Sequence, residues 1–114
     1  MAVYKIARFV VRAEARDQAE RAMHEFAAYV RRELADSSWT TYCDPQAPNH
    51  YVSFIRADSA AADDRHRSAP GTQAFVAALY PLVEGSVEFT ELQLVTSSDL
   101  APRHRESKPR RRPR

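Results

Sequence analysis

The chain has 114 residues, of which 44% are hydrophobic and 28% are charged, and these values are typical of one soluble globular domain. No apolar run approaches the roughly 20 residues that a membrane span requires. Lys5 and Arg8 interrupt the N-terminal stretch before the apolar core of a signal sequence could form. We therefore expect a cytoplasmic protein without a membrane segment.

The formal net charge of +2 combines two regions of opposite sign. Residues 101–114 contain seven Lys and Arg against one Glu, whereas residues 1–100 contain ten against fourteen acidic residues. We divide the chain into a folded domain at 1–100 and a basic, disordered tail at 101–114, because the tail has three prolines and no aromatic residue. The tail could bind phosphates electrostatically, but without aromatic residues to stack on bases a nucleic-acid partner is not expected.

Cysteine and histidine usage argues against a metal centre. The single cysteine, Cys43, cannot form an internal disulfide. The four histidines are too widely spaced for a recognised metal motif: His24, His50, His66 and His104. We expect no structural metal.

The first half of the chain predicts a strand, a helix and a hairpin. Residues 3–11 place apolar side chains on both faces, as in a strand that is buried on both sides. Residues 17–35 change to helical spacing with one apolar stripe. Two β-rich runs, at 38–43 and 50–57, flank the turn signal "DPQAPN" and predict a hairpin.

The second half predicts a broken helical segment. Ser59 can cap a helix that runs to about residue 68, and Pro70 interrupts it. A second helix follows, and Pro81 and Gly85 are expected to end it. Its apolar stripe consists of Phe75, Leu79 and Leu82.

A last strand is expected within residues 86–96, where alternation through Val87 and Phe89 changes phase at Leu92. This phase change predicts a β-bulge near Thr90–Glu91. The order β-α-β-β-α-β predicts an α+β, ferredoxin-like fold, with a four-stranded antiparallel sheet and both helical segments on one face.

The other face of this sheet needs a cover, because the first and third strands have apolar residues on both faces. A second copy of the chain is the simplest cover. We therefore expect a homodimer in which two sheets pack face to face as a dimeric α/β barrel.

Two stretches, "DPQAPNHYVSFIR" at 44–56 and "RHRSAPGTQAFVAALYPLVEG" at 65–85, resemble segments of the antibiotic biosynthesis monooxygenase family. The first is similar to the family's second hairpin and the other to its second helical segment, and the likeness spans about residues 3–96. The resemblance implies a dimeric ferredoxin-like protein. It also implies a monooxygenase that oxidises quinols, anthrones or related phenols with dioxygen and without metal, flavin or haem.

The chain also departs from its relatives. Ile55 and Ala57 stand where many members carry an acidic residue and a tryptophan near the end of the third strand. In the haem-degrading relatives an asparagine, a tryptophan and a histidine serve the haem. Ala7 or Arg8, His66 and about Val76 stand in those places here, so the resemblance implies no haem.

Cofactor-free oxidation requires an apolar pocket, a base and aromatic walls that hold a flat ring. Five aromatic residues are candidates for binding the substrate, and each also fits ordinary core packing. They are Phe26, Trp39, Phe54, Phe75 and Tyr80.

His66 is the candidate base. Ala62 and Ala69 lie on its side of the helix and leave room for a ligand, and the pKa of about 6.5 of a free imidazole suits proton abstraction. The alternative is that its ring closes the helix by bonding a carbonyl near Pro70. Arg8 would be either a clamp for a phenolate or a partner in an ion pair at the dimer interface.

The leading functional hypothesis is a cofactor-independent monooxygenase that oxidises an aromatic polyketide-like or quinol substrate to a quinone. A second is a non-oxidative protein that binds a small aromatic ligand, or a polyketide cyclase-like protein. A third is a structural dimer that acts through its basic tail. Oxygen uptake would separate the first hypothesis from the others.

Overall fold

The computed structural model describes residues 1–99, so the predicted tail at 101–114 lies outside the described residues. The elements, in chain order, are β1 (Val3–Val11), a short 3₁₀ helix η1 (Ala13–Ala15), α1 (Arg16–Glu33), β2 (Ser37–Asp44), β3 (Ala47–Ala57), α2 (Ala60–Ser68), α3 (Pro70–Leu79), a second 3₁₀ helix η2 (Tyr80–Leu82) and β4 (Val83–Leu92).

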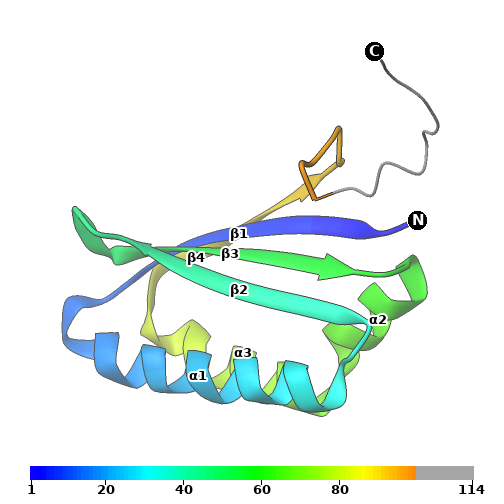
Figure 1. The fold of residues 1–114 in the computed structure, drawn as a ribbon. Coiled ribbons are helices and arrows are strands. Elements are labelled where there is room, and N and C mark those ends of the chain that lie inside the picture. The colour runs from blue at the N-terminus through cyan, green and yellow to red at the C-terminus, as the bar shows by residue number, and fades with distance from the viewer. Residues whose placement is uncertain (100–114) are drawn as a thin grey trace.

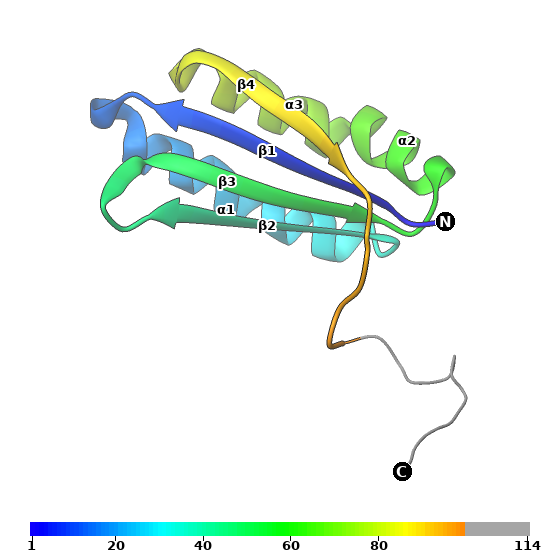
Figure 2. The ribbon, with the colours of Figure 1, turned by 90° about the horizontal axis from the view of Figure 1, so that it is seen from above.

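The predicted ferredoxin-like fold is confirmed. The four strands form one antiparallel sheet in the order β2-β3-β1-β4. All three α-helices lie on the same face of this sheet (Figure 1), and Figure 2 shows the four strands side by side above them. Within residues 1–99, no helix is long and apolar enough to cross a membrane.

Helix α1 packs on the sheet through a stripe of buried residues spaced three and four positions apart, which is the periodicity that places side chains on one helical face. The stripe consists of Ala19, Met23, Phe26 and Val30. The first two contribute to a core cluster with Phe9, Val11 and Tyr51 of the sheet, and the last two to a second cluster with Leu34 and Ala69.

The break between α2 and α3 follows from local chemistry. Ser59 caps α2 as predicted, because its hydroxyl accepts a hydrogen bond of 3.1 Å from the Ala62 amide. Pro70 occupies the first turn of α3, where a missing amide proton costs nothing, and it forces Ala69 into an extended conformation. The two helices therefore meet end to end at Ala69.

The end of α3 and the bulge differ from the prediction. Gly85 does not end a helix: it lies inside β4 with φ +71°, a conformation that favours glycine. The register pairs Arg8 with Glu88 and Val10 with Glu84, so Phe9 alone faces residues 85–87 of β4. The irregularity is thus at Gly85, and the predicted bulge at Thr90–Glu91 is wrong.

The face of the sheet opposite the helices, here called the open sheet face, carries several apolar side chains. Tyr42, Phe54 and Leu92 are 57%, 46% and 41% exposed, and the rings of Tyr42 and Phe54 meet edge to face at 5.7 Å. No helix of the described chain covers this face (Figure 1). The predicted homodimer would cover it and stays a prediction.

Candidate active site

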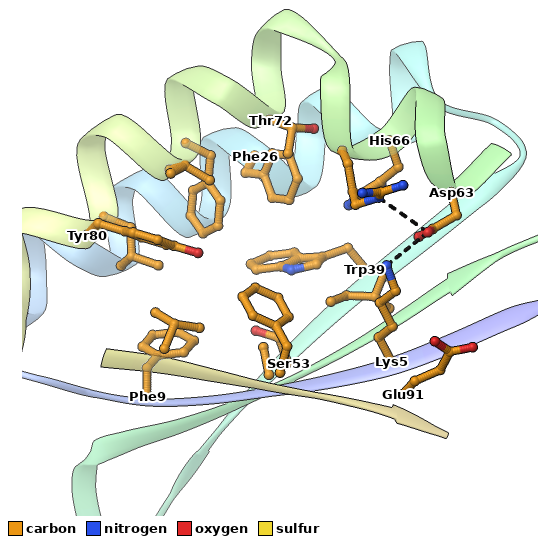
Figure 3. A pocket seen from close by; sticks show the side chains of 18 residues that line it. Lys5, Phe9, Phe26, Trp39, Ser53, Asp63, His66, Thr72, Tyr80 and Glu91 are labelled. Carbon is orange, nitrogen blue, oxygen red and sulfur yellow. Dashed lines mark hydrogen bonds and ion pairs between the residues drawn. The ribbon is translucent and has the colours of Figure 1, made fainter. Parts of the chain in front are cut away.

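A cavity of about 410 Å³ lies between the sheet and the helices. This volume is within the range of small-molecule sites. The sheet contributes Ala7 and Phe9 from β1 and Ile55 from β3, while α3 contributes Val76 and Leu79. The lining is therefore mainly apolar. Its charged side chains, among them Lys5 and Asp63, gather with His66 at one end of the cavity (Figure 3).

Three aromatic rings from three different elements form one side of this cavity. Phe26 of α1 and Phe75 of α3 are stacked with centroids 4.4 Å apart and an angle of 2° between the rings. Trp39 of β2 meets both edge-on, at 5.0 Å and 5.4 Å. These rings pack against the core and line the cavity at the same time, so core packing and contact with a ligand are compatible roles.

His66 lies in the last turn of α2 and lines the cavity, with only 5% of its surface exposed. Its ring meets the edge of Phe26 at a centroid distance of 5.7 Å. The Nδ1 atom is buried and has no hydrogen-bond partner among residues 1–99.

The alternative role for His66, closing the helix, is taken by other side chains. The Ser68 hydroxyl donates to the Asp64 carbonyl at 2.8 Å, and the Gln73 amide donates to the Arg67 carbonyl at 2.8 Å. Both bonds lie at the junction of α2 and α3, where the sequence suggested a histidine cap. The His66 ring points to the cavity instead (Figure 3).

Burial lowers the pKa of His66 below its ordinary value, because the charged imidazolium loses its hydration. The negative charge of Asp63 opposes this effect, and the positive charge of Lys5 adds to it. At neutral pH the imidazole is therefore uncharged and can accept a proton.

A charged cluster lies beside His66 at one end of the cavity. The Asp63 carboxylate accepts a hydrogen bond from Lys5 Nζ at 2.8 Å and pairs with Arg67 Nε at 3.4 Å. Figure 3 shows both interactions converging on this carboxylate. Glu91 of β4 also lines the cavity and is the cross-strand neighbour of Lys5.

Sequence reasoning missed this cluster, although part of it was readable. Asp63 lies three residues before His66 and four before Arg67, a spacing that puts all three on one face of α2. Lys5 lies two residues before Ala7 and therefore shares its face of β1. Nothing in the linear sequence says that these two faces meet.

Two hydroxyl groups in the wall were also missed. The Ser53 hydroxyl lies on the sheet side and shares a hydrogen bond of 2.7 Å with the Thr41 hydroxyl. Thr72, in the first turn of α3, is 8% exposed, and its Oγ1 atom is buried without a partner among residues 1–99.

Two predicted substrate-binding residues lie outside the cavity. Arg8 and Phe54 point to the open sheet face, because they alternate with Ala7 and Ser53, which face the helices. Arg8 is exposed and stands opposite Glu88 of β4, so no buried phenolate clamp forms there. Tyr80 lines the cavity with 42% of its surface exposed.

The fold resembles several solved structures. Rv0793 from Mycobacterium tuberculosis superposes with a TM-score of 0.77 and 26% identity, over 87% of this chain and 100% of that chain. A proposed antibiotic biosynthesis monooxygenase from Bacteroides thetaiotaomicron gives a TM-score of 0.79 and 13% identity, over 88% and 95%. A variant of SnoaB, a cofactor-independent oxygenase from Streptomyces nogalater, gives 0.74 and 21%, over 87% and 98%.

No protein-family model matches the sequence, and no curated protein matches it. The structural matches nevertheless confirm the resemblance that two segments of the sequence indicated. The chain has the fold of the antibiotic biosynthesis monooxygenase structures, an α+β, ferredoxin-like domain.

Proposed function

We propose that the protein is a cofactor-independent monooxygenase that oxidises an aromatic polyketide-like or quinol substrate to a quinone. One observation carries the proposal: a neutral, almost fully buried imidazole with an unpartnered nitrogen lines an apolar cavity beside three aromatic rings. The fold likeness to a cofactor-independent oxygenase supports the same class of reaction.

The proposed chemistry starts with proton transfer from the phenolic hydroxyl to His66. The phenolate then gives one electron to dioxygen, and the aryloxyl and superoxide radicals combine with formation of a C–O bond. The proton held on His66 returns to the peroxide. Loss of water, with the hydrogen of the same carbon, leaves a quinone carbonyl. The substrate supplies all four electrons, one oxygen atom enters the product and the other leaves as water.

The surrounding residues support these steps in different ways. Phe26, Trp39 and Phe75 hold a flat ring by stacking and edge contacts and keep water away from it. Asp63 stabilises the imidazolium that forms when His66 takes the proton, because its charge favours the protonated ring. Lys5 holds that carboxylate in place.

The proposed assembly is a homodimer that buries the open sheet face of each copy. Its support is the exposure of Tyr42 and Phe54 on a face that no helix of the described chain covers. Arg8 and Glu88 lie on the same face and offer complementary charges to a second copy.

This function is tested by measuring the oxygen consumption of the protein with a panel of quinols and anthrones, in buffer that contains a metal chelator. We expect uptake of one dioxygen per quinone formed and, with isotopically labelled dioxygen, one labelled atom in the product. Tight binding of these compounds without oxygen uptake would favour the second hypothesis, a non-oxidative aromatic-binding or cyclase-like protein.

A further inference from the structure

Three described residues of the cavity lining carry a hydroxyl group, and they differ in where that group points. The Ser53 hydroxyl is bonded to the Thr41 hydroxyl at 2.7 Å. The Thr72 hydroxyl is buried and points away from the cavity (Figure 3). The Tyr80 hydroxyl points toward the middle of the cavity (Figure 3), and the residue is 42% exposed. Tyr80 therefore presents the hydroxyl that a ligand in the cavity can reach.

The backbone of Tyr80 is held in place on both sides. Leu79 before it and Leu82 after it are buried, at 2% and 7% exposure. Arg12 bonds η2 to the turn that follows β1, because its amide donates to the Leu82 carbonyl at 3.0 Å and its guanidinium to the Pro81 carbonyl at 2.6 Å. The phenol ring thus starts from a fixed position at this end of the cavity.

The Tyr80 phenol is a hydrogen-bond donor at neutral pH. Burial raises its pKa, because the phenolate would lose hydration. In Tyr51, by comparison, the hydroxyl already donates to the Glu20 carboxylate at 2.6 Å. Burial is the only cause of the raised pKa of Tyr80, and no acceptor within residues 1–99 takes its proton in a hydrogen bond. This donor is therefore available to a ligand.

Tyr80 and the charged side chains lie at opposite ends of the cavity. His66 and Arg67 come just before α3, and Tyr80 directly follows its last residue. The ten residues of α3 rise by about 15 Å along the helix axis. Figure 3 shows the same separation, with Tyr80 on one side and Lys5 and Asp63 on the other. A ligand that bonds at both places must carry a polar atom at each end.

We propose that Tyr80 is a specificity-determining residue, whose hydroxyl donates to an acceptor oxygen at one end of an aromatic ligand while a phenolic hydroxyl at the other end meets His66. The preferred ligand is a phenol with a carbonyl oxygen at the far end of its ring system. The rings between these two oxygens lie against the apolar lining. The inference rests on the proposed function in that the cavity takes a phenol, and it adds the orientation of that phenol.

The test measures binding under argon, so that no turnover is required. The probes are 6-hydroxytetralone, which has a phenolic hydroxyl and a carbonyl at opposite ends of two fused rings, and tetrahydro-2-naphthol, which lacks only the carbonyl oxygen. Equilibrium dialysis gives the Kd of each. We expect wild type to bind the ketone more tightly than the phenol without a carbonyl.

The informative variant is Tyr80→Phe, which keeps the ring and removes the hydroxyl. We expect it to weaken binding of 6-hydroxytetralone about tenfold, as for the loss of one hydrogen bond, and to leave binding of tetrahydro-2-naphthol unchanged. Unchanged binding of the second probe also shows that the variant keeps a folded cavity. The two probes should then bind to the variant with nearly equal Kd.

The matched control is Tyr42→Phe. It removes the hydroxyl of another exposed tyrosine, which lies on the open sheet face and does not line this cavity. We expect both Kd values of this variant to equal those of wild type.

The inference is overturned if neither probe binds to wild type, if wild type binds both probes equally, or if Tyr80→Phe keeps the preference for the ketone or weakens both probes to the same extent. The outcome differs from that of the proposed function. Discrimination by Tyr80 without oxygen uptake in air would refute the oxygenase and leave the inference standing. Oxygen uptake without discrimination would refute the inference alone.

Discussion

The Nζ atom of Lys5 lies 2.8 Å from Oδ2 of Asp63, and this ion pair joins β1 to α2 across 58 positions of sequence. The two side chains are only 20% and 10% exposed. Breaking a buried pair leaves a charge without its partner, which costs more than the pair contributes when intact. The pair thus connects the end of the cavity that holds His66 to β1, one of the two central strands of the sheet.

Asp63→Asn should lower the free energy of unfolding by up to about 3 kcal/mol, because it removes the ion-pair partner of the half-buried Lys5 ammonium. It should also lower the pKa of His66 further, since Asp63 makes a larger contribution than Asp36 to stabilising the imidazolium. Urea denaturation and NMR titration of the imidazole measure the two effects. Asp64→Asn is the matched control, because Asp64 is 69% exposed and should have little effect on either quantity.

The lowered pKa of His66 makes stability depend on pH. Below the ordinary histidine pKa of about 6.5, the unfolded chain binds a proton that the folded chain resists, so the native state loses stability as the pH falls. We expect the wild-type free energy of unfolding to drop between about pH 7.5 and about pH 5.5 by more than that of His66→Gln. Identical pH dependence in the two proteins would contradict the burial of the imidazole.

Gly71→Ala should destabilise the protein, because a Cβ atom at this position of α3 would lie 2.4 Å from the ring of Tyr29 on α1. Overpacking of this kind costs about 1–3 kcal/mol and exceeds the gain in helix propensity of about 1 kcal/mol. In a Tyr29→Ala background the same substitution should become neutral or stabilising. A thermodynamic cycle on the four proteins isolates this coupling.

Phe54→Glu should dissociate the proposed dimer, because it puts a charge at the centre of the open sheet face. Phe89→Glu is the matched control. Phe89 is more exposed, at 57% against 46%, but lies on the cavity side of β4. Sedimentation analysis should give a monomer for the first variant and the wild-type mass for the second. A monomeric wild type at micromolar concentration would refute the dimer.

The order and type of the elements could be predicted because apolar residues repeat with the period of each element. Which face of β1 packs against the helices could not be predicted from the sequence. Ile6 and Ala7 are both buried, at 6% and 4%, although they point to opposite sides of the sheet. A strand with two apolar faces does not say which one meets the helices. For this reason Arg8 and Phe54 were assigned to the cavity, and Lys5 and Ser53 were overlooked.

The site was partly predictable for similar reasons. Small neighbours on its helix pointed to His66, whereas Thr72 carried no signal, since its lack of a partner depends on how two helices meet. The bulge was misplaced because a change of phase within one strand does not reveal where its neighbour pairs. The register with β1 puts the extra residues at Gly85, where the positive φ also requires glycine.

The central claim is that His66 takes the phenolic proton, and the pH dependence of kcat/KM for oxygen uptake tests it most directly. Wild type should lose activity on the acidic side with a pKa below the ordinary histidine value, since burial lowers it. His66→Gln keeps the size and a hydrogen bond but cannot titrate, so it should lose this acidic limb and about 10²-fold or more in rate. Full activity of His66→Gln with an unchanged pH profile would contradict the account.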